Sequence, residues 1–302
     1  MSEAAATIRR MRVGVIDVGS NTVRLLIAAQ SGLAVDALCE RRAYLRLGEE
    51  VERLGWISES KLRATAETVR GFAREAAGYG CHHLEVVLTA PGRRAANADE
   101  LVDALARAAA GRVRVLSAED EGRLAWAGAL VGEEELPESV AVCDSGGGST
   151  EVVVGTPAHG PIWLRSLDVG SLTVRALLPD DPPGRGAMTS ACDEVSTWLD
   201  GFAPPLPKAA FATGGTARAL RRVCGRSLDR EALEAALRTL AKRRAGELAA
   251  KHGLDAERAW TLAGGAIVLA EVQRRLGVPL VVSRTGLREG VAVTMLAELA
   301  AA

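Results

Sequence analysis

The sequence predicts an α/β protein composed of two related domains, and three observations support this fold class. The chain has 302 residues, enough for two domains of ordinary size. Short apolar runs typical of strands alternate with longer runs of helical periodicity, which is the pattern of layered α/β folds. Residues 13–28 are echoed at 140–155, 127 residues later and without a gap, which favours a duplicated domain.

The first half of the chain is predicted to alternate strands and helices. Strands are expected in four segments rich in Val, Ile and Leu, at 13–16, 25–28, 84–88 and 112–116. A helix is expected from Lys61, where apolar residues recur at helical spacing until Gly78 ends the pattern. Asn97 is predicted to cap the next helix, with Glu100 in the capping-box position, and Ser117 to open a third.

The second half repeats this alternation. Strands are expected near 140–143, 151–154, 162–167 and 208–212. Helices are expected at about 170–178, 190–201, 215–223, 230–251, 256–275 and 287–300. The proline-rich segments 179–186 and 203–207 are predicted loops. The basic run Lys242, Arg243 and Arg244 is expected on a solvated face of the helix at 230–251, with a ligand-guiding patch as the alternative. The better candidates for a ligand-facing cluster are Arg218, Arg221 and Arg222, which follow Gly214 and Gly215.

The internal repeat places an acid and a glycine at the same position of two strand–turn–strand units. Its four identities set Val13, Val15, Asp17 and Gly19 on Val140, Val142, Asp144 and Gly146. A chance match of four residues in sixteen is the alternative, but the apolar pattern also agrees on both flanks. We therefore expect two equivalent hairpins, one in each domain.

The two turns contain groups suited to phosphate and to a divalent cation. Glycine lets backbone N–H groups approach an anion, and the carboxylates of Asp17 and Asp144 are ligands that Mg²⁺ prefers. Two ordinary hairpin turns are the structural alternative, since Gly and Asp are common there. A third glycine pair, Gly214 and Gly215, is predicted to open a helix, either as an anion site or as a plain turn.

Composition excludes several other classes of protein. The 37 Lys and Arg residues against 38 Asp and Glu residues give a net charge of −1, which does not favour nucleic acid or an anionic membrane as partner. No uncharged apolar run reaches the ~18 residues of a membrane span. The basic cluster Arg9, Arg10 and Arg12 precedes an apolar run that Asp17 interrupts, so no signal peptide is expected. Five cysteines without C-x-x-C spacing favour a reducing cytoplasm over disulfides or zinc.

Four motifs in this order resemble the exopolyphosphatase/guanosine pentaphosphate phosphohydrolase (Ppx/GppA) family. They are I-D-V-G-S-N-T at 16–22, E-D-E-G-R-L at 119–124, D-S-G-G-G-S-T-E at 144–151 and A-T-G-G-T-A-R-A-L at 212–220. The resemblance implies two ribonuclease-H-like domains of the actin/hexokinase/Hsp70 superfamily, with the active site in the cleft between them. We expect the domains at 1–125 and 126–302, with the helix at 287–302 packing back on the first.

The resemblance also implies roles for individual residues. Glu121 matches the catalytic acid that activates the attacking water, and Arg93 matches an arginine that contacts phosphate. Asp144 and Glu151 match the residues that organise Mg²⁺ and the water, and Asp17 is the further expected metal ligand. The expected phosphate-binding residues are Asp17, Gly19, Ser20, Asn21, Gly146, Gly147, Gly148, Ser149, Thr150, Gly214 and Gly215. Without the resemblance, Glu121 would be an ordinary acid in the first turn of a helix.

The expected activity is Mg²⁺-dependent removal of the terminal phosphate from inorganic polyphosphate. Guanosine pentaphosphate 5′-phosphohydrolase uses the same residues and stays open, as does a sensor that binds polyphosphate or the nucleotide without turnover. An actin-like kinase with Gly214 and Gly215 at the adenosine is a further alternative. The family resemblance implies a homodimer. Short chains are the expected substrate, because the sequence lacks the C-terminal extension with which longer members grip long polyphosphate.

Overall fold

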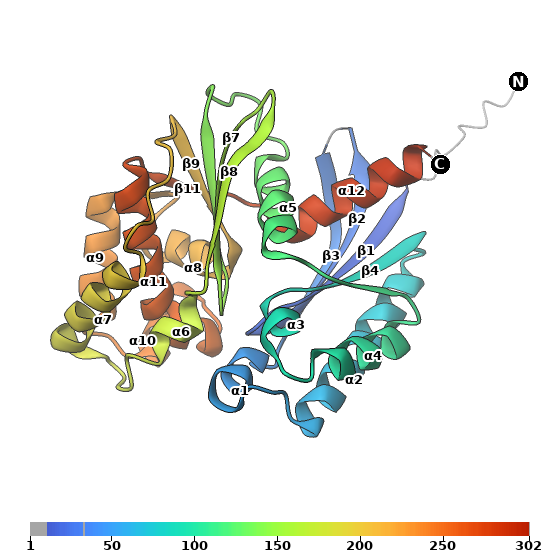
Figure 1. The fold of residues 1–302 in the computed structure, drawn as a ribbon, viewed down its shortest axis with the longest axis horizontal. Coiled ribbons are helices and arrows are strands. Elements are labelled where there is room, and N and C mark those ends of the chain that lie inside the picture. The colour runs from blue at the N-terminus through green and yellow to red at the C-terminus, as the bar shows by residue number, and fades with distance from the viewer. Residues whose placement is uncertain (1–10, 33, 302) are drawn as a thin grey trace, which may run out of the picture.

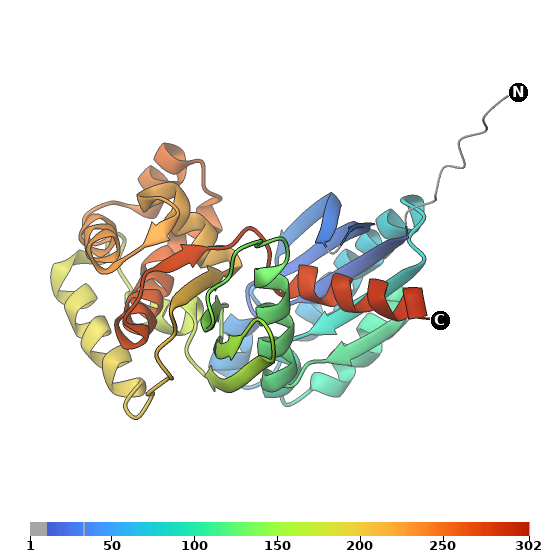
Figure 2. The same cartoon turned by 90° about the horizontal axis from the view of Figure 1, so that it is seen from above.

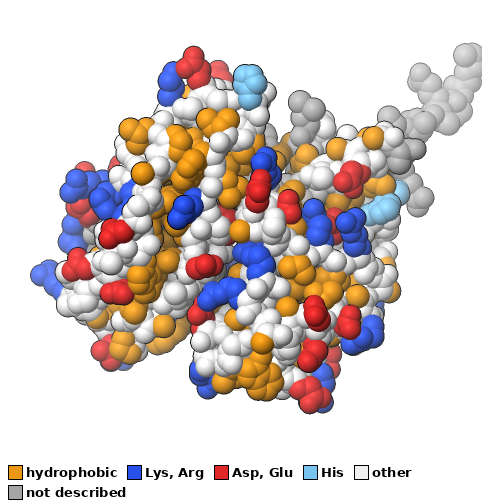
Figure 3. All heavy atoms as spheres, viewed as in Figure 1, with side chains coloured by type: hydrophobic (Ala, Val, Ile, Leu, Met, Phe, Trp, Pro, Cys, Tyr) orange, Lys and Arg blue, Asp and Glu red, His pale blue; other side chains and the backbone are white. Residues whose placement is uncertain are grey.

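The computed structural model describes residues 11–32 and 34–301, so Arg9 and Arg10 of the basic cluster lie outside the described residues. Two β-sheets, each with helices packed against it, form two lobes that lie side by side (Figure 1). Figure 3 shows acidic and basic side chains interspersed over one face of both lobes. No helix among the described residues is long and apolar enough to cross a bilayer.

The first lobe is a five-stranded sheet in the order β3-β2-β1-β4-β5. Its strands are β1 (Arg12–Val18), β2 (Thr22–Ser31), β3 (Ala34–Tyr44), β4 (His83–Leu88) and β5 (Arg112–Val115). Its helices are α1 (Leu47–Leu54), α2 (Glu59–Gly78), α3 (Ala90–Arg94) and α4 (Ala98–Ala109). The apolar sides of α2 and α4 bury one face of this sheet, where they pack on Ile16, Leu25 and Val86.

The second lobe is a six-stranded sheet in the order β10-β11-β9-β6-β7-β8. Its strands are β6 (Val140–Ser145), β7 (Thr150–Thr156), β8 (Gly160–Leu167), β9 (Ala209–Thr213), β10 (Ser227–Leu228) and β11 (Leu280–Val282). Its helices are α6 (Ser171–Arg175), α7 (Gly184–Trp198), α8 (Gly214–Cys224), α9 (Arg230–Leu240), α10 (Ala245–His252) and α11 (Ala256–Leu276). The largest aliphatic core of the molecule lies between this sheet and these helices.

The two sheets have the same topology. Apart from β10, the order β8-β7-β6-β9-β11 repeats β3-β2-β1-β4-β5. In each lobe the first two strands form an antiparallel hairpin, and the first strand also pairs in parallel with the fourth. The predicted α/β fold of two ribonuclease-H-like domains is therefore confirmed, and the repeat in the sequence corresponds to the two hairpins.

Two helices lie between the sheets, α5 (Ala118–Leu130) and α12 (Leu287–Ala301), as Figures 1 and 2 show. The C-terminal α12 packs on the first sheet, where Val291 meets Val13 and Val15. Helix α5 and the start of α12 pack closely together. A Cβ atom added to Gly128 would lie only 1.9 Å from the carbonyl oxygen of Gly286, so glycine is needed at this contact. The predicted domain boundary between residues 125 and 126 falls inside α5, and this boundary stays a prediction.

Ion pairs also join the lobes near the ends of β3 and α1. Arg42 pairs with Asp255 at 2.5 Å, and the hydroxyl of Tyr44 donates to the same carboxylate at 3.4 Å. Arg46 pairs with Glu257 in the first turn of α11. These contacts connect the lobes in addition to the packing of α5 against α12.

The prediction of one helix at 230–251 is wrong, because the chain breaks between α9 and α10. The carbonyl of Ala241 accepts a hydrogen bond from the amide of Gly184 at 3.1 Å, and the amide of Ala245 donates to the Asp181 carboxylate at 2.8 Å. These bonds replace the ones that a continuous helix would make. The basic run 242–244 therefore lies in a turn and not on a helix face.

Other predicted elements differ in their ends or were missed. The helix predicted from 190 begins at Gly184, and the one predicted at 170–178 is only five residues long. Asn97 does not cap α4 with its side chain, since its amide group bonds both backbone groups of Ile57 at 2.9 Å. Strands β3, β10 and β11 and helices α1 and α3 were not predicted.

Candidate active site

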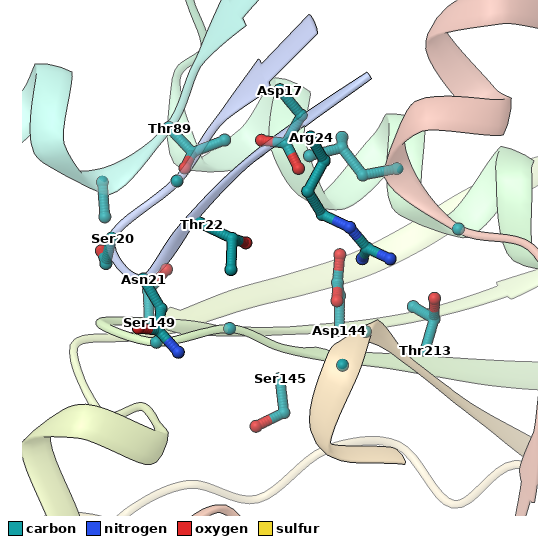
Figure 4. Close-up of a pocket in the computed structure, with 18 of the residues that line it drawn as sticks. Asp17, Ser20, Asn21, Thr22, Arg24, Thr89, Asp144, Ser145, Ser149 and Thr213 are labelled. Carbon is teal, nitrogen blue, oxygen red and sulfur yellow. The ribbon is translucent and has the colours of Figure 1, made fainter. Parts of the chain in front are cut away.

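A polar cleft between the lobes collects most of the predicted site residues. From the first lobe it is lined by Asp17, Gly19, Ser20 and Asn21, and Glu121 contributes from α5. From the second lobe it is lined by Asp144, Gly146, Gly147, Gly148, Ser149, Gly214 and Gly215. Arg93, Thr150 and Glu151 are not on its wall. Figure 4 shows the labelled side chains from the two sheets converging on this space.

The turns of the two hairpins are closed in the same way. The amide of Gly19 donates to the carbonyl of Thr22 at 3.0 Å, and the amide of Gly146 donates to that of Ser149 at 2.9 Å. These two bonds lie 127 residues apart, the offset of the sequence repeat. Two segments that are far apart in the sequence thus present equivalent loops to the same cleft.

In both loops, carbonyl groups accept hydrogen bonds from the first turns of nearby helices, whereas several backbone amides have no partner among the residues that the structure describes. The amides of Gly48 and Leu172 donate to the carbonyls of Ser20 and Gly147, both at 2.8 Å. Within the described residues, the amides of Ser20, Asn21, Gly147 and Gly148 donate no hydrogen bond. The buried side-chain amide of Asn21 also lacks a partner there. Unpaired buried donors are costly, so these loops are suited to bind an anion.

The carboxylates of Asp17 and Asp144 face the cleft from opposite lobes (Figure 4). Within the described part of the chain, neither carboxylate has a side-chain hydrogen bond, and the nearby arginines act on both through charge alone. Burial raises the pKa of both groups, that of Asp144 to about 6. Arg218 opposes this rise at Asp144, whereas the charge of Asp17 adds to it. Two desolvated acids without a partner would gain from a bound cation.

These two acids fit the way proteins bind Mg²⁺ beside phosphates. No three His, Cys, Asp or Glu side chains among residues 11–32 and 34–301 form a complete metal site. Mg²⁺ is usually held by one or two carboxylates together with water and substrate phosphates. Asp17 and Asp144 supply such a partial set, and the free amides beside them would hold the phosphates.

Glu121 lies in the first turn of α5 and is paired with Arg93. It is 7% exposed, and its Oε2 accepts a hydrogen bond from Arg93 Nη1 at 2.7 Å. The same Nη1 donates to the carbonyl of Leu116 at 2.9 Å, which fixes the guanidinium beside the cleft wall and not on it. Burial raises the pKa of Glu121 to about 7, although Arg93 lowers it. A carboxylate of this kind can take a proton near neutral pH.

Glu151 and Thr150 lie behind the wall of the cleft. Glu151 Oε1 accepts a hydrogen bond from the Ser166 hydroxyl at 2.9 Å and lies 3.9 Å from Arg93 Nη2. Burial and then the charge of Glu121 raise the pKa of Glu151 well above its ordinary value. The hydroxyl of Thr150 donates to the carbonyl of Val169 at 2.7 Å and is fully buried. Arg93 thus stands between two carboxylates, and Thr150 has a structural bond.

Arg218, a candidate for a ligand-facing cluster, lies on the cleft wall. Three other arginines on the wall were not predicted, namely Arg24, Arg258 and Arg288. Arg288 is held by the carbonyl of Leu25 at 3.1 Å and by Glu40 at 2.6 Å. The Nε atoms of Arg24 and Arg258 are buried without a partner among the described residues. One signal was available, because Arg24 is a lone charge within the apolar run Val23–Ile27. The others come from distant segments that only the fold brings together.

The cleft therefore combines phosphate donors, two acids suited to a cation and one carboxylate that can accept a proton. Such a set matches phosphoryl transfer, which depends on positioning and charge neutralisation more than on covalent chemistry.

Comparison with known proteins agrees with this chemistry. A model of the Ppx/GppA phosphatase family matches residues 26–299. Exopolyphosphatase 1 of Mycobacterium tuberculosis H37Rv is 32% identical, and that of Mycobacterium leprae is 31% identical. Both alignments cover 93% of this chain, and they cover 87% and 88% of those proteins.

Solved structures show the same fold. A structure of the Aquifex aeolicus Ppx/GppA family member has a TM-score of 0.81 at 25% identity, covering 96% of this chain and 98% of that one. An exopolyphosphatase from Cytophaga hutchinsonii has a TM-score of 0.82 at 20% identity, covering 95% and 98%. Since a family match over most of the sequence accompanies this likeness, the chain belongs to the Ppx/GppA phosphatase family.

Proposed function

We propose that the protein is an exopolyphosphatase that hydrolyses the terminal anhydride bond of inorganic polyphosphate. The observation that carries the proposal is the meeting of two amide-presenting loops and Glu121 at one cleft between the lobes. The relatives named exopolyphosphatase, which align over 93% of the chain, support the same substrate.

In the proposed reaction, a water attacks the terminal phosphorus, which forms a new P–O bond as the bridging P–O bond breaks. Glu121 takes a proton from this water, and Arg93 holds the Glu121 carboxylate in place. The products are orthophosphate and a chain shorter by one phosphate. The loop amides and the cleft arginines hold the phosphate oxygens. Mg²⁺, held by Asp17 and Asp144, would neutralise phosphate charge when bound.

Guanosine pentaphosphate is the competing substrate, because removal of its 5′ phosphate needs the same groups. The test is a phosphate-release panel with tripolyphosphate, long polyphosphate, guanosine pentaphosphate and ATP, each with and without Mg²⁺. We expect Mg²⁺-dependent release with the highest kcat/KM on a polyphosphate. A higher kcat/KM on guanosine pentaphosphate would reassign the activity, and binding without release by the wild type would favour a sensor. Homodimer formation stays a prediction from the family resemblance, and a cytoplasmic location stays a prediction from the cysteine content.

A further inference from the structure

A second pocket opens directly off the catalytic cleft. The two share four residues, Arg24, Gly215, Arg218 and Arg258. Beyond them the second pocket is lined by Arg42 on β3, Arg222 on α8 and Arg284 after β11, together with Glu40, Ala219, Gly253, Leu254 and Asp255. A ligand that leaves the cleft past Arg218 therefore enters this second pocket.

The lining of the second pocket is strongly cationic. Six arginines line it, against two acids. Both acids already have arginine partners, since Glu40 pairs with Arg288 at 2.6 Å and Asp255 with Arg42 at 2.5 Å. The net charge of the whole chain is −1, so this excess is local and not a consequence of composition. A pocket of this kind concentrates polyanions.

At its inner end, the pocket is formed by a buried arginine that packs against a helix. Arg258 is 9% exposed, and its Nε has no partner among the described residues. Its guanidinium lies over the first turn of α8, because a Cβ atom on Gly215 would meet Arg258 Nη2 at 2.3 Å. A helix N-terminus carries positive partial charge, so an anion bound there would stabilise an arginine packed against it.

The lining also distinguishes between classes of anion. The apolar side chains of the second pocket are Ala219 and Leu254, and its lining contains no aromatic ring on which a base could stack. Guanidinium groups repeated along the wall suit phosphates repeated along a chain. The same position, beside Gly214 and Gly215, is where a nucleoside would lie if the protein were an actin-like kinase.

We propose that this second pocket is a distal subsite that binds the phosphates of a polyphosphate chain beyond the ones held in the cleft. The proposal rests on the proposed function for the identity of the chain. It assigns Arg222 and Arg284, with Arg42, the role of determining chain-length preference. The Arg284 side chain is exposed and has no hydrogen-bond or ion-pair partner among the described residues, and the Arg222 guanidinium donates to the carbonyl of Gly253.

The test compares the double variant Arg222→Ala/Arg284→Ala with a control that loses the same charge, Arg70→Ala/Arg185→Ala. The control residues are exposed on α2 and α7. KM is measured with tripolyphosphate and with long polyphosphate. Loss of two charge-assisted contacts is expected to raise KM for long chains by roughly tenfold or more, and KM for tripolyphosphate by much less. The control should change neither. Arg284→Ala alone, which removes no internal bond, should give the same trend if the double variant folds poorly.

Direct binding separates this proposal from the proposed function. If the wild type releases no phosphate from any polyphosphate, that function fails, but Kd for long polyphosphate still tests the subsite by calorimetry. A rise in Kd for long chains in the double variant, with a weaker dependence on salt, supports the subsite. An equal change for both chain lengths, or no change beyond that of the control, would overturn it. Loss of guanosine pentaphosphate binding with long-chain binding intact would assign the pocket to a nucleoside and overturn it too.

Discussion

Replacement of Glu121 by Gln gives the most informative test of the site. Glutamine keeps the size of the side chain and can still accept a hydrogen bond from Arg93, but its amide group cannot take a proton from water near neutral pH. If Glu121 is the proton acceptor, phosphate release should fall by ~10² to 10⁴-fold. In the wild type, kcat/KM should rise with pH through an apparent pKa near 7, because only the ionised carboxylate accepts a proton.

The same variant has a calculable effect on stability. Burial raises the pKa of Glu121 from 4.5 to about 7, and each pKa unit corresponds to ~1.4 kcal/mol. The folded protein therefore keeps a proton on Glu121 that the unfolded chain releases, and the unfolding free energy of the wild type decreases as pH rises across this interval. Glu121→Gln has no such titrating group, so its unfolding free energy should not show this decrease. The difference in unfolding free energy, variant minus wild type, should grow by about 3 kcal/mol between roughly pH 4 and pH 8.

The assay is urea denaturation of ligand-free wild type and variant at both pH values. Asp144, whose pKa burial raises in the same pH range, is present in both proteins. Glu151 loses in the variant the neighbouring charge that raises its pKa, which changes the difference in the same direction as the loss of Glu121 itself. Glu119→Gln is the matched control, because Glu119 lies in the same first turn of α5 but is exposed and paired with Arg123. The difference in unfolding free energy between Glu119→Gln and the wild type should change little between the two pH values. A Glu121→Gln difference that is equal at both pH values would refute the assignment of a buried, proton-accepting carboxylate.

The remaining predictions test the partner of Glu121, the crossing of α5 and α12, and the metal ligands. Arg93→Ala removes the cation that lowers the pKa of Glu121, so the rising limb of kcat/KM should move to higher pH, whereas Arg93→Lys should move it less. Gly128→Ala should lower stability by about 1–3 kcal/mol, because its Cβ would lie 2.6 Å from the amide of Gly290, while Gly71→Ala, in open space on α2, should raise Tm. Asp144→Asn should raise the Mg²⁺ concentration for half-maximal activity by about tenfold or more, and an unchanged concentration would argue against its role.

Much of the site could be predicted because its two loops are local in sequence. An apolar strand, an acid, a glycine turn and a second strand are enough to specify a hairpin, and the repeat at 127 residues indicated that there are two. The loop residues from Gly146 to Ser149 accordingly line the cleft. The role of Glu121 depended on resemblance, since an acid in the first turn of a helix has no distinct pattern of its own.

What sequence reasoning missed depends on contacts between distant segments. Arg258 and Arg288 lie on α11 and α12, and only the packing of these helices brings their guanidinium groups to the cleft that Arg218 of α8 also lines. Strand β3 was missed because most of its side chains are exposed and several are charged, so it lacks the apolar alternation of a buried strand. The break between α9 and α10 depends on bonds to Asp181 and Gly184, which no local pattern reveals.

The two hairpins share a geometry but not a charge, and this asymmetry explains how one duplicated unit serves two tasks. The repeat aligns Arg24 with Glu151, and each lies opposite the equivalent aspartate, Asp17 or Asp144, across its hairpin. Arg24 lines the cleft, whereas Glu151 lies behind it and interacts with Glu121.

These placements predict that replacing Arg24 and replacing Glu151 affect different kinetic constants. Arg24→Gln should raise KM for polyphosphate and leave the pH limb near 7, because it removes a phosphate donor and not a partner of Glu121. Glu151→Gln should lower kcat and leave KM nearly unchanged, because Glu151 lies behind the cleft wall and helps to position Arg93 beside Glu121. If both variants changed KM alone, the two hairpins would be equivalent phosphate clamps, and the division of tasks between them would be wrong.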